Sequence, residues 1–429
     1  MTVKRITVVV LLALIGAGCH WLDPRPGFGP ALQVRVGPPG AGGARAVDVI
    51  AADLPDGTAA VTSVRLDTKH GPLVATGSTL PLHFTFDVSQ AGPGPHIFFV
   101  RTRISKEERR RGLAVFSGGI RLNQMQALGT HNSYHTYPKP GLDAIAALQY
   151  SEDPLDVQLQ DQGVRQFELD VNVTNDGTDS FAVVHVQGID EGTTCRAFLD
   201  CLTTIRTWSQ AHPQHAPIAI LLELKDNDFA LANLPFSNWV APDLNRLDTA
   251  IRSVFGENEM FTPDDLRGGH ATLPEAIATD GWPEINAVRG QVMFMMDNGA
   301  PFRGWYRDGH PALSGRVIFT NANPGDDDAA FVKRNDAKGS FADIQWLIAQ
   351  GYVIRTRTDS DTVEARVNDT SVRDAAFAGG ATWVSSDFVV PGRAFGTPYV
   401  VAIPGGTPAR CNPINSPSWC TSDLVEALP

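Results

Sequence analysis

Cysteine is scarce in this chain, and the apolar run near its start is too short to span a membrane. The 429 residues contain five cysteines, and no two of them have the short CxxC spacing that is typical of a zinc site. The apolar run at residues 6–14 falls well below the roughly 20 residues that a membrane-spanning helix needs. These features argue against a cysteine-rich zinc centre and against a helical anchor in this run.

Positive charge is also in deficit. The chain has 35 Lys and Arg residues against 47 Asp and Glu residues, which gives a formal net charge of -12. Such a surface argues against nucleic acid as a partner and against electrostatic docking to anionic lipid. The basic run at residues 106–111 is the local exception, and we interpret it as a solvated face.

The first 18 residues have the pattern of an export signal. Two basic residues precede the apolar run, and small residues at 16–18 precede Cys19. This arrangement resembles a bacterial lipoprotein signal, with Cys19 as the lipidated first residue of the mature protein at the cell envelope. Ordinary signal-peptidase cleavage, which would release a secreted protein, is the alternative.

Export favours disulfide bonds among the other four cysteines. Four cysteines allow three pairings, and the short separations in this chain favour two local ones. We therefore expect Cys195 to pair with Cys201 and Cys411 to pair with Cys420, with free buried thiols as the alternative.

After a tether at residues 19–30, two domains are expected. Residues 31–118 carry short apolar or alternating runs separated by Gly, Pro and Asp, which predicts a small antiparallel β-sandwich of immunoglobulin-like type. Residues 119–429 alternate strand-like and helical stretches, which predicts a (β/α)8 barrel of the TIM type. A doubly wound open sheet is less favoured, because no glycine-rich dinucleotide fingerprint follows the first strand.

Eight barrel strands are expected in this second domain. They are residues 125–129, 164–171, 181–186, 218–224, 292–296, 317–320, 352–357 and 382–385. Helices are expected between many of them, at residues 197–211, 244–255, 341–350 and 362–378.

Polar residues gather at the ends of the first four of these strands. They are His131, Asn132, Glu168, Asp170, His185, Glu223 and Lys225. The C-terminal strand ends of a barrel meet at one face, so these side chains are expected to converge. Glu168 and Asp170 are two residues apart and share a strand face, where two carboxylates need a compensating charge. An oxygen-rich set of Asn132, Glu168, Asp170 and Glu223 suits Ca²⁺, with Mg²⁺ less favoured; separate surface ion pairs are the alternative.

The motifs that carry these residues resemble a known family. They are Ala-Leu-Gly-Thr-His-Asn-Ser-Tyr at 127–134, Phe-Glu-Leu-Asp-Val at 167–171, His185, and Leu-Glu-Leu-Lys at 222–225. In order and spacing they are similar to the catalytic half of the phosphatidylinositol-specific phospholipase C superfamily, in particular its calcium-dependent bacterial type. The resemblance covers roughly residues 120–390. It implies that His131 and His185 act on a phosphodiester and that Asn132, Glu168, Asp170 and Glu223 bind calcium.

The second half of the barrel offers candidates for substrate contact. Arg355 and Arg357 share one face of their strand and are candidates to hold phosphate or an inositol hydroxyl; an ion pair with Asp387 is the alternative. Lys225 either contacts phosphate or balances Glu223 and Asp226. The aromatic residues of 302–306 are candidates to insert into a bilayer.

The resemblance implies a calcium-dependent enzyme that cleaves phosphatidylinositol to diacylglycerol and inositol 1,2-cyclic phosphate. His185 would protonate the leaving oxygen, and His131 would contact the phosphate or share the base role with Glu168. We expect a monomer that meets a phospholipid or another phosphodiester at a membrane surface.

Two rival functions remain open at this stage. The first is a glycerophosphodiester phosphodiesterase; in that family the first histidine is usually followed by Arg-Gly, where this chain has Asn132-Ser133. The second is a non-catalytic cell-surface binding protein, in which the β module binds and the barrel is a scaffold.

Overall fold

The computed structural model describes residues 32–39, 44–51, 55–66, 71–87, 94–105, 107–117, 119–175, 180–226, 229 and 231–426. The chain separates into two compact units, Met1–Gly119 and Ile120–Pro429. The predicted signal at residues 1–18, Cys19 and the predicted tether lie outside the described residues. Within the described ranges, none of the helices combines the length and the apolar character that crossing a bilayer requires.

The N-terminal unit consists of two small antiparallel sheets. One has the order β1 (Leu32–Pro39), β2 (Ala44–Ala51), β5 (Leu82–Asp87), and the other has the order β4 (Leu73–Leu80), β3 (Thr58–Leu66), β6 (Gly94–Ile104), β7 (Glu107–Ser117). In β3 the buried residues alternate with more exposed ones, as expected for a strand with one covered face. Val49, Val64 and Phe98 join strands of both sheets in one apolar core. The predicted small antiparallel β module is therefore present.

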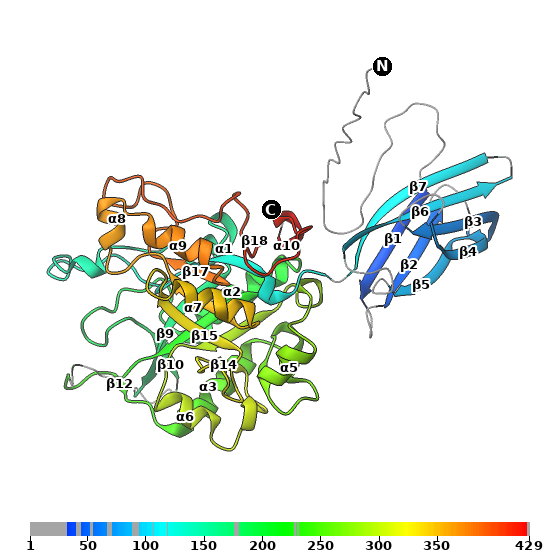
Figure 1. The fold of residues 1–429 in the computed structure, drawn as a ribbon. Coiled ribbons are helices and arrows are strands. Elements are labelled where there is room, and N and C mark those ends of the chain that lie inside the picture. The colour runs from blue at the N-terminus through cyan, green and yellow to red at the C-terminus, as the bar shows by residue number, and fades with distance from the viewer. Residues whose placement is uncertain are drawn as a thin grey trace. The chain divides into compact units, whose positions relative to one another are not determined.

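The C-terminal unit is built on eight parallel strands (Figure 1). Their order in the sheet is β14 (Ile318–Thr320), β13 (Val292–Met296), β11 (Ile218–Leu224), β9 (Gln166–Thr174), β8 (Met125–Thr130), β17 (Trp383–Ser386), β16 (Val353–Arg357), β15 (Phe331–Asp336). A parallel bridge between Asn321 and Phe331 links the segment after β14 to β15, so the sheet nearly closes on itself. The prediction of an α/β barrel is confirmed.

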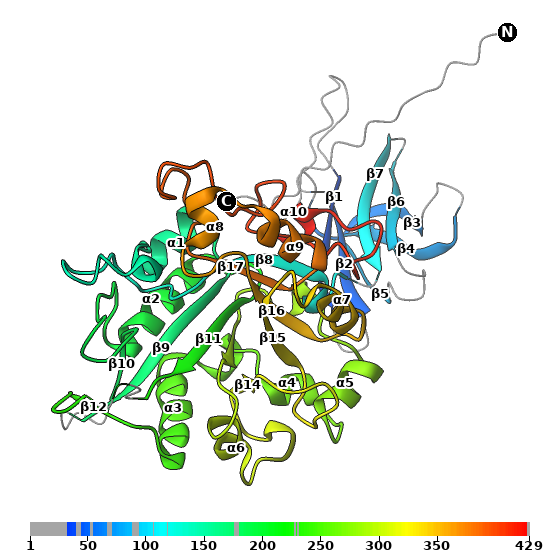
Figure 2. The same ribbon diagram turned by 60° about the vertical axis from the view of Figure 1, so that its left-hand side comes forward.

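Helices cover the outside of this sheet, as the two ribbon views show (Figures 1 and 2). They are α1 (Leu155–Asp161), α2 (Phe198–Ala211), α3 (Ala241–Val254), α4 (Pro263–Arg267), α5 (Leu273–Thr279), α6 (Phe302–Arg307), α7 (Phe341–Ala349), α8 (Val363–Val367), α9 (Ser371–Gly379) and α10 (Ser422–Val425), with short 3-10 turns at Leu122–Gln124, Ala146–Leu148, Glu257–Glu259, Ile285–Ala287 and Pro311–Leu313. In α3 the buried Leu244, Leu247 and Ile251 recur at helical spacing and face the core.

The expected single helix at 362–378 is instead two helices. Asn368 has a φ of 53° and ends α8, because the left-handed conformation that asparagine tolerates terminates a helix. The chain then restarts as α9.

One expected barrel strand is wrong and another was missed. Residues 181–186 form only the short strand β10 (Phe181–Val183), which pairs antiparallel with β9. A parallel strand needs a crossover of a dozen or more residues, and only six residues separate β9 from β10 in the sequence. The eighth barrel strand is β15, whose polar residues hide its apolar start at Phe331 and Val332. His185 therefore lies in a loop after a hairpin strand and not on the barrel itself.

Two further short strands and two disulfides complete the unit. The short strand β12 (Phe236–Ser237) pairs with β9, and β18 (Ala409–Cys411) pairs with β8, both antiparallel. Cys195 pairs with Cys201 and Cys411 pairs with Cys420, with Cα–Cα distances of 5.5 and 6.0 Å, which confirms the predicted pairing.

Candidate functional site

The polar residues predicted from the sequence meet at the C-terminal mouth of the barrel. In the pairing of β9 with β11, which lie side by side in Figure 2, Asp170 stands opposite Glu223. His131 directly follows β8, and its backbone N–H donates to the carbonyl of Ser386 at the end of β17. The parallel register thus brings the ends of separate strands to one place.

Three carboxylates form a compact cluster in this mouth. Glu168, Asp170 and Glu223 each place an oxygen within 4.8 Å of the others. Burial raises the pKa of Glu168 to about 7 despite the nearby Arg355. Burial and the neighbouring Glu223 also raise the pKa of Asp170 well above its usual range. Carboxylates in such surroundings favour a bound proton or a bound cation.

Asp170 and Asn132 carry oxygens that are not satisfied by the protein. Neither carboxylate oxygen of Asp170 accepts a hydrogen bond of good geometry from any described residue, although the Tyr134 hydroxyl lies near it. Asn132 donates through its amide nitrogen to the Tyr150 hydroxyl at 2.8 Å, while its buried Oδ1 has no partner among the described residues. Buried polar atoms are normally paired, so these oxygens are available to bind a cation or another ligand.

The loop after β8 is tied firmly to β9 around Asn132. Asn132 has a φ of 43°, a left-handed conformation that asparagine accepts more readily than most residues. Next to it, the Ser133 N–H donates to the Glu168 carbonyl at 3.0 Å, and the Glu168 N–H donates to the Ser133 hydroxyl at 2.8 Å. The predicted set of Asn132, Glu168, Asp170 and Glu223 therefore fits an all-oxygen cation site, the donor type that Ca²⁺ prefers.

Two cationic side chains already neutralise part of this cluster. The ammonium of Lys225 lies 3.1 Å from Glu223 Oε1 and 3.5 Å from Asp170 Oδ2. Burial opposes the charged form of Lys225, but Asp170 and Glu223 outweigh it and raise the pKa. Asp226, a predicted partner of Lys225, accepts instead from the backbone N–H of Trp239 at 2.7 Å.

Arg355 is the second of these cations and is fully buried. It donates to Ser385 Oγ at 2.9 Å, to Asn335 Oδ1 at 2.7 Å and to the carboxylate of Glu168. Each of its three guanidinium nitrogens thus has a protein partner. This geometry favours a role in holding Glu168 over the predicted direct contact with a substrate.

His131 and Arg357 share one carboxylate. Nδ1 of His131 lies 2.7 Å from Asp387 Oδ1, and Nε2 lies 3.2 Å from Arg357 Nη1. Arg357 in turn lies 3.3 Å from Asp387 Oδ2, so the ion pair we weighed for it forms. Burial and the Arg357 charge lower the pKa of His131 well below its usual value, which favours a neutral imidazole.

His185 has its own carboxylate partner, Asp190. Its Nδ1 lies 2.9 Å from Asp190 Oδ2, and the buried His135 places Nε2 2.8 Å from the same oxygen. Burial acts against ionisation of Asp190, but the hydrogen bonds from both histidines outweigh it and lower the pKa. The His185 side chain is 22% exposed, so the outer part of its ring faces the opening.

Ring contacts connect the two predicted catalytic histidines. The Tyr150 ring lies 6.1 Å from the His131 ring and 4.4 Å from the His135 ring, measured between centroids. The His135 ring lies 5.8 Å from that of His185. The structure therefore brings His131 and His185 into one mouth.

Sequence reasoning missed several residues of this mouth. Tyr150, His135 and Asp190 come from loops, and nothing local in the sequence distinguishes Tyr150 and Asp190 from other loop residues. Asp387 was considered only as a partner for the arginines. His135 does have a local signal, because it follows His131 by four residues and comes directly after the motif at 127–134.

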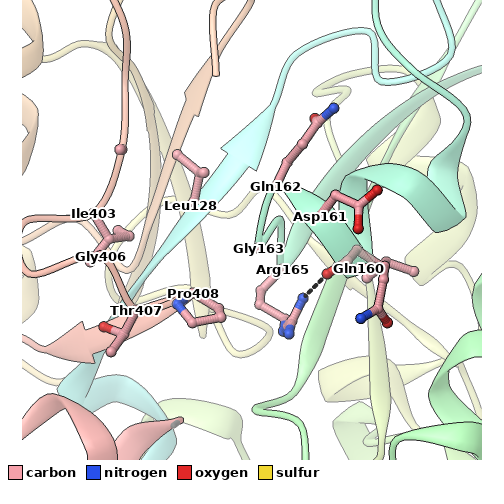
Figure 3. Close-up of a pocket in the computed structure, with 12 residues that line it drawn as sticks. Leu128, Gln160, Asp161, Gln162, Gly163, Arg165, Ile403, Gly406, Thr407 and Pro408 are labelled. Carbon is pink, nitrogen blue, oxygen red and sulfur yellow. Dashed lines mark hydrogen bonds between the residues drawn. The ribbon is translucent and has the colours of Figure 1, made fainter. Parts of the chain in front are cut away.

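Two of the cavities lined by described residues of this unit have charged residues in their walls. One, of about 320 Å³, borders the mouth and is lined by Asn335, Asp336, Arg357, Asp359, Ser360, Glu364 and Val372. The other, of about 160 Å³, lies beside the beginning of β9 (Figure 3). Its charged residue Arg165 donates to the Leu159 carbonyl at 3.0 Å and pairs with Glu426, so this second cavity offers no free guanidinium.

Comparison with known proteins gives a family match over the barrel. A family model described as phosphoinositide phospholipase C, Ca2+-dependent, matches residues 120–182 and 175–413. No curated protein sequence matches the chain.

Several solved structures resemble it. A Ca²⁺-dependent phosphatidylinositol-specific phospholipase C from Streptomyces antibioticus has 21% identity and a TM-score of 0.45, covering 65% of this chain and 98% of its own. A calcium-dependent phosphoinositol-specific phospholipase C from a Pseudomonas species has 16% identity and a TM-score of 0.47, covering 68% and 96%. A phosphatidylinositol-specific phospholipase C from Listeria monocytogenes has 12% identity and a TM-score of 0.41, covering 66% and 94%.

Proposed function

Because this chain belongs to the calcium-dependent phosphoinositide phospholipase C family, we propose that it cleaves phosphatidylinositol to diacylglycerol and inositol 1,2-cyclic phosphate. One observation supports this most directly. Two imidazoles, His131 and His185, each have their own carboxylate and share a mouth with three clustered carboxylates whose oxygens are only partly satisfied.

The substrate supplies its own nucleophile. The 2-hydroxyl of inositol is adjacent to the phosphate on position 1, so its attack on phosphorus loses little freedom of motion. Bound calcium, held by Asn132, Glu168, Asp170 and Glu223, would lower the pKa of this hydroxyl and neutralise charge that develops on the phosphate.

His131 is suited to accept the proton of the 2-hydroxyl. Asp387 takes the Nδ1–H of the ring, so Nε2 carries the lone pair and accepts from Arg357 until the substrate arrives. Burial and Arg357 keep the imidazole neutral, as a general base must be before the reaction. Arg357 then lies next to the position of the phosphate and offers a charged donor to its oxygens.

His185 is suited to protonate the leaving oxygen of diacylglycerol. The carboxylate of Asp190 holds Nδ1 and stabilises the positive charge of a protonated ring. The P–O bond to diacylglycerol breaks as the bond from the 2-oxygen to phosphorus forms, and His185 gives its Nε2 proton to the departing oxygen. In a second step the roles reverse, with a water molecule opening the cyclic phosphate.

The cavity beside Arg357 offers a place for the inositol ring. Six of its seven lining residues carry polar or charged side chains, among them Asn335, Asp359 and Ser360. A polyol needs such donors and acceptors, since each of its hydroxyls leaves water on binding.

A membrane surface is the proposed meeting place with the lipid. Large apolar residues are exposed in the segments that follow the barrel strands, some in loops and two in helix α8: Tyr137, Ile145, Phe229, Leu231, Val363, Val367 and Phe395. The predicted aromatic segment 302–306 does not contribute, because Phe302 and Tyr306 are buried in α6. The acidic net charge favours neutral over anionic lipid around the substrate.

Export through the N-terminal signal, with lipid on Cys19, remains part of this proposal. The two disulfides are consistent with export to an oxidising compartment. Lipidation would hold a monomeric enzyme close to the envelope.

Phosphorus NMR of the reaction would test the function. Phosphatidylinositol vesicles are incubated with the purified chain, with calcium or with a chelator in excess. We expect an inositol cyclic phosphate signal that is lost with chelator. Release of glycerol phosphate from deacylated diesters, with no action on the lipid, would instead support a glycerophosphodiester phosphodiesterase. A folded protein that turns over neither substrate would support a binding protein.

A further inference from the structure

His135, His185 and Asp190 form a second cluster of possible metal ligands, of a different donor type from the carboxylate cluster. One ligand atom of each residue lies within 4.8 Å of the other two. Both imidazole nitrogens point at the same carboxylate oxygen, Oδ2 of Asp190, from 2.8 and 2.9 Å. The two rings and the carboxylate therefore bring three possible ligand atoms to one small region.

The chemistry of these donors differs from that of the calcium set. Two imidazoles and one carboxylate suit Zn²⁺ and related transition metals, whereas carboxylate and amide oxygens suit Ca²⁺. We propose that His135, His185 and Asp190 bind one Zn²⁺ ion, with water in the fourth position. Because the two donor sets differ, the two ions can occupy neighbouring sites without exchanging places.

The local structure allows an ion to enter. His185 is 22% exposed, while the side chains of His135 and Asp190 are 0% and 3% exposed, so an ion reaches the cluster past His185. Nδ1 of His135 has no hydrogen bond to any described residue. The proton of this ring can therefore move from Nε2 to Nδ1 without breaking another contact, which frees Nε2 for a metal.

His135 is held in place for this role. Its ring stacks on Tyr150 at 4.4 Å, and its backbone N–H donates to the carbonyl of Asn132 at 2.8 Å. A ligand that is oriented before binding loses less freedom when the ion arrives.

The consequence for catalysis rests on the proposed function. His185 would be the acid that protonates the leaving group, and a ring nitrogen bound to zinc fixes the ring and its charge. Zinc would then inhibit cleavage while calcium is still bound, and the inhibition would not be reversed by more calcium.

Calorimetric titration of the calcium-saturated full chain with zinc chloride tests the site. We expect one tight site per chain, with no release of calcium. Addition of Co²⁺ in place of zinc should give the visible absorption of a low-coordinate cobalt centre with nitrogen ligands. His135→Gln should weaken zinc binding by more than about 100-fold, since loss of a ligand exceeds the effect of losing a supporting contact.

His270→Gln is the matched control, because His270 lies on the surface beside carboxylates alone, 2.8 Å from Asp280 and 3.9 Å from Glu275, and belongs to neither group of possible metal ligands among the described residues. This variant should bind zinc as the unaltered chain does. The calcium affinity of His135→Gln reports whether the mouth of this variant is still folded. If the mouth is not folded, Asp190→Asn is used instead, because it keeps the shape of the side chain. This variant should show the same loss of zinc affinity.

The proposal is overturned if the unaltered chain binds no zinc, if zinc displaces calcium, or if the folded His135→Gln or Asp190→Asn variant binds zinc normally. These measurements do not depend on turnover. A chain that binds zinc at this cluster but does not cleave phosphatidylinositol would refute the proposed function alone, and an active chain without a zinc site would refute only this inference.

Discussion

Replacing Lys225 with methionine should raise the affinity of the chain for calcium. The ammonium of Lys225 lies 3.1 Å from Glu223 and 3.5 Å from Asp170, two of the proposed ligands. In the ion-free protein it lowers the repulsion between these carboxylates, and in the loaded protein it repels the ion. Both effects oppose calcium binding. Removal of the charge therefore raises the free energy of the ion-free protein and lowers that of the loaded protein, and each change increases the calcium affinity.

The size of the effect follows from the geometry. Calcium lies about 2.3–2.6 Å from its ligand oxygens, so an unmoved ammonium would be roughly 5 Å from the ion. At that distance the repulsion is about 2 kcal/mol with the dielectric constant of water and about 7 kcal/mol at an effective value of 20. The Lys225 side chain is 15% exposed and has a flexible stem, so it can swing outward and reduce the repulsion. We therefore expect the lower end of this range, about 2 kcal/mol, which is a gain in affinity of about 30-fold.

Calorimetric titration with calcium would measure this change without reference to activity. Lys139→Met is the matched control, because it removes the same charge from an exposed loop that also follows β8. Its calcium affinity should stay close to that of the unaltered chain. If Lys225→Met binds calcium as weakly as the unaltered protein, or more weakly, the ammonium does not compete with the ion and the reasoning fails.

Three further predictions concern catalysis, lipid contact and stability. His185→Ala should lower cleavage of phosphatidylinositol by about 10²- to 10⁴-fold while calcium affinity stays nearly constant in a titration; a large loss of affinity would refute the division of roles. The side chain of Val367 is 72% exposed on the rim, and Val367→Asp should slow cleavage of lipid in vesicles but leave cleavage of a short-chain soluble analogue unchanged. The control is Val61→Asp, at a side chain that is 71% exposed on the β module, and it should leave both cleavage rates unchanged. His215 is buried with a pKa lowered from 6.5 to about 4 by burial, so the unfolded chain binds the proton more tightly. The stability that neutral His215 gives is present at neutral pH, and the free energy of unfolding falls by roughly 3 kcal/mol in all as the pH drops from 6.5 towards 4. Urea unfolding at both pH values should show a smaller fall in this free energy for His215→Gln.

The barrel could be predicted because its strands are buried on both faces. Runs such as Ile218–Leu224 and Val292–Met296 are nearly all apolar, and the helices between them show their own period. The one missed strand, β15, carries Lys333 and Asn335 towards the polar mouth, and these residues break its apolar pattern. Four of the six residues of β15 are polar, which leaves too short an apolar pattern to predict a strand.

The candidate site could be predicted only in part. Glu168, Asp170 and Glu223 lie on barrel strands. Residues two apart on a strand share one face, and the C-terminal ends of the strands meet at one face of the barrel, which was enough to place these three together. The partners that orient the histidines, Asp190 above all, come from irregular loops whose path depends on tertiary contacts. His185 was predicted at the end of a barrel strand, but it lies in the loop after β10, which pairs antiparallel with β9. Its location in the mouth was therefore predicted for an incorrect reason.

The arrangement of charge explains how the mouth can tolerate the loss of its ion. Arg355 is buried against Glu168, and Lys225 lies between Asp170 and Glu223, so two built-in cations face three carboxylates. The raised pKa of Glu168, about 7, allows a proton to reduce the remaining charge near neutral pH, and burial with the neighbouring Glu223 raises the pKa of Asp170 as well. Neither cation gives Asp170 a hydrogen bond of good geometry, and neither reaches the buried Oδ1 of Asn132. These oxygens can therefore still bind a hard cation in the folded protein. Under the proposed function, calcium would then serve the chemistry rather than the folding, and residues such as Lys225 would set how much calcium the site requires.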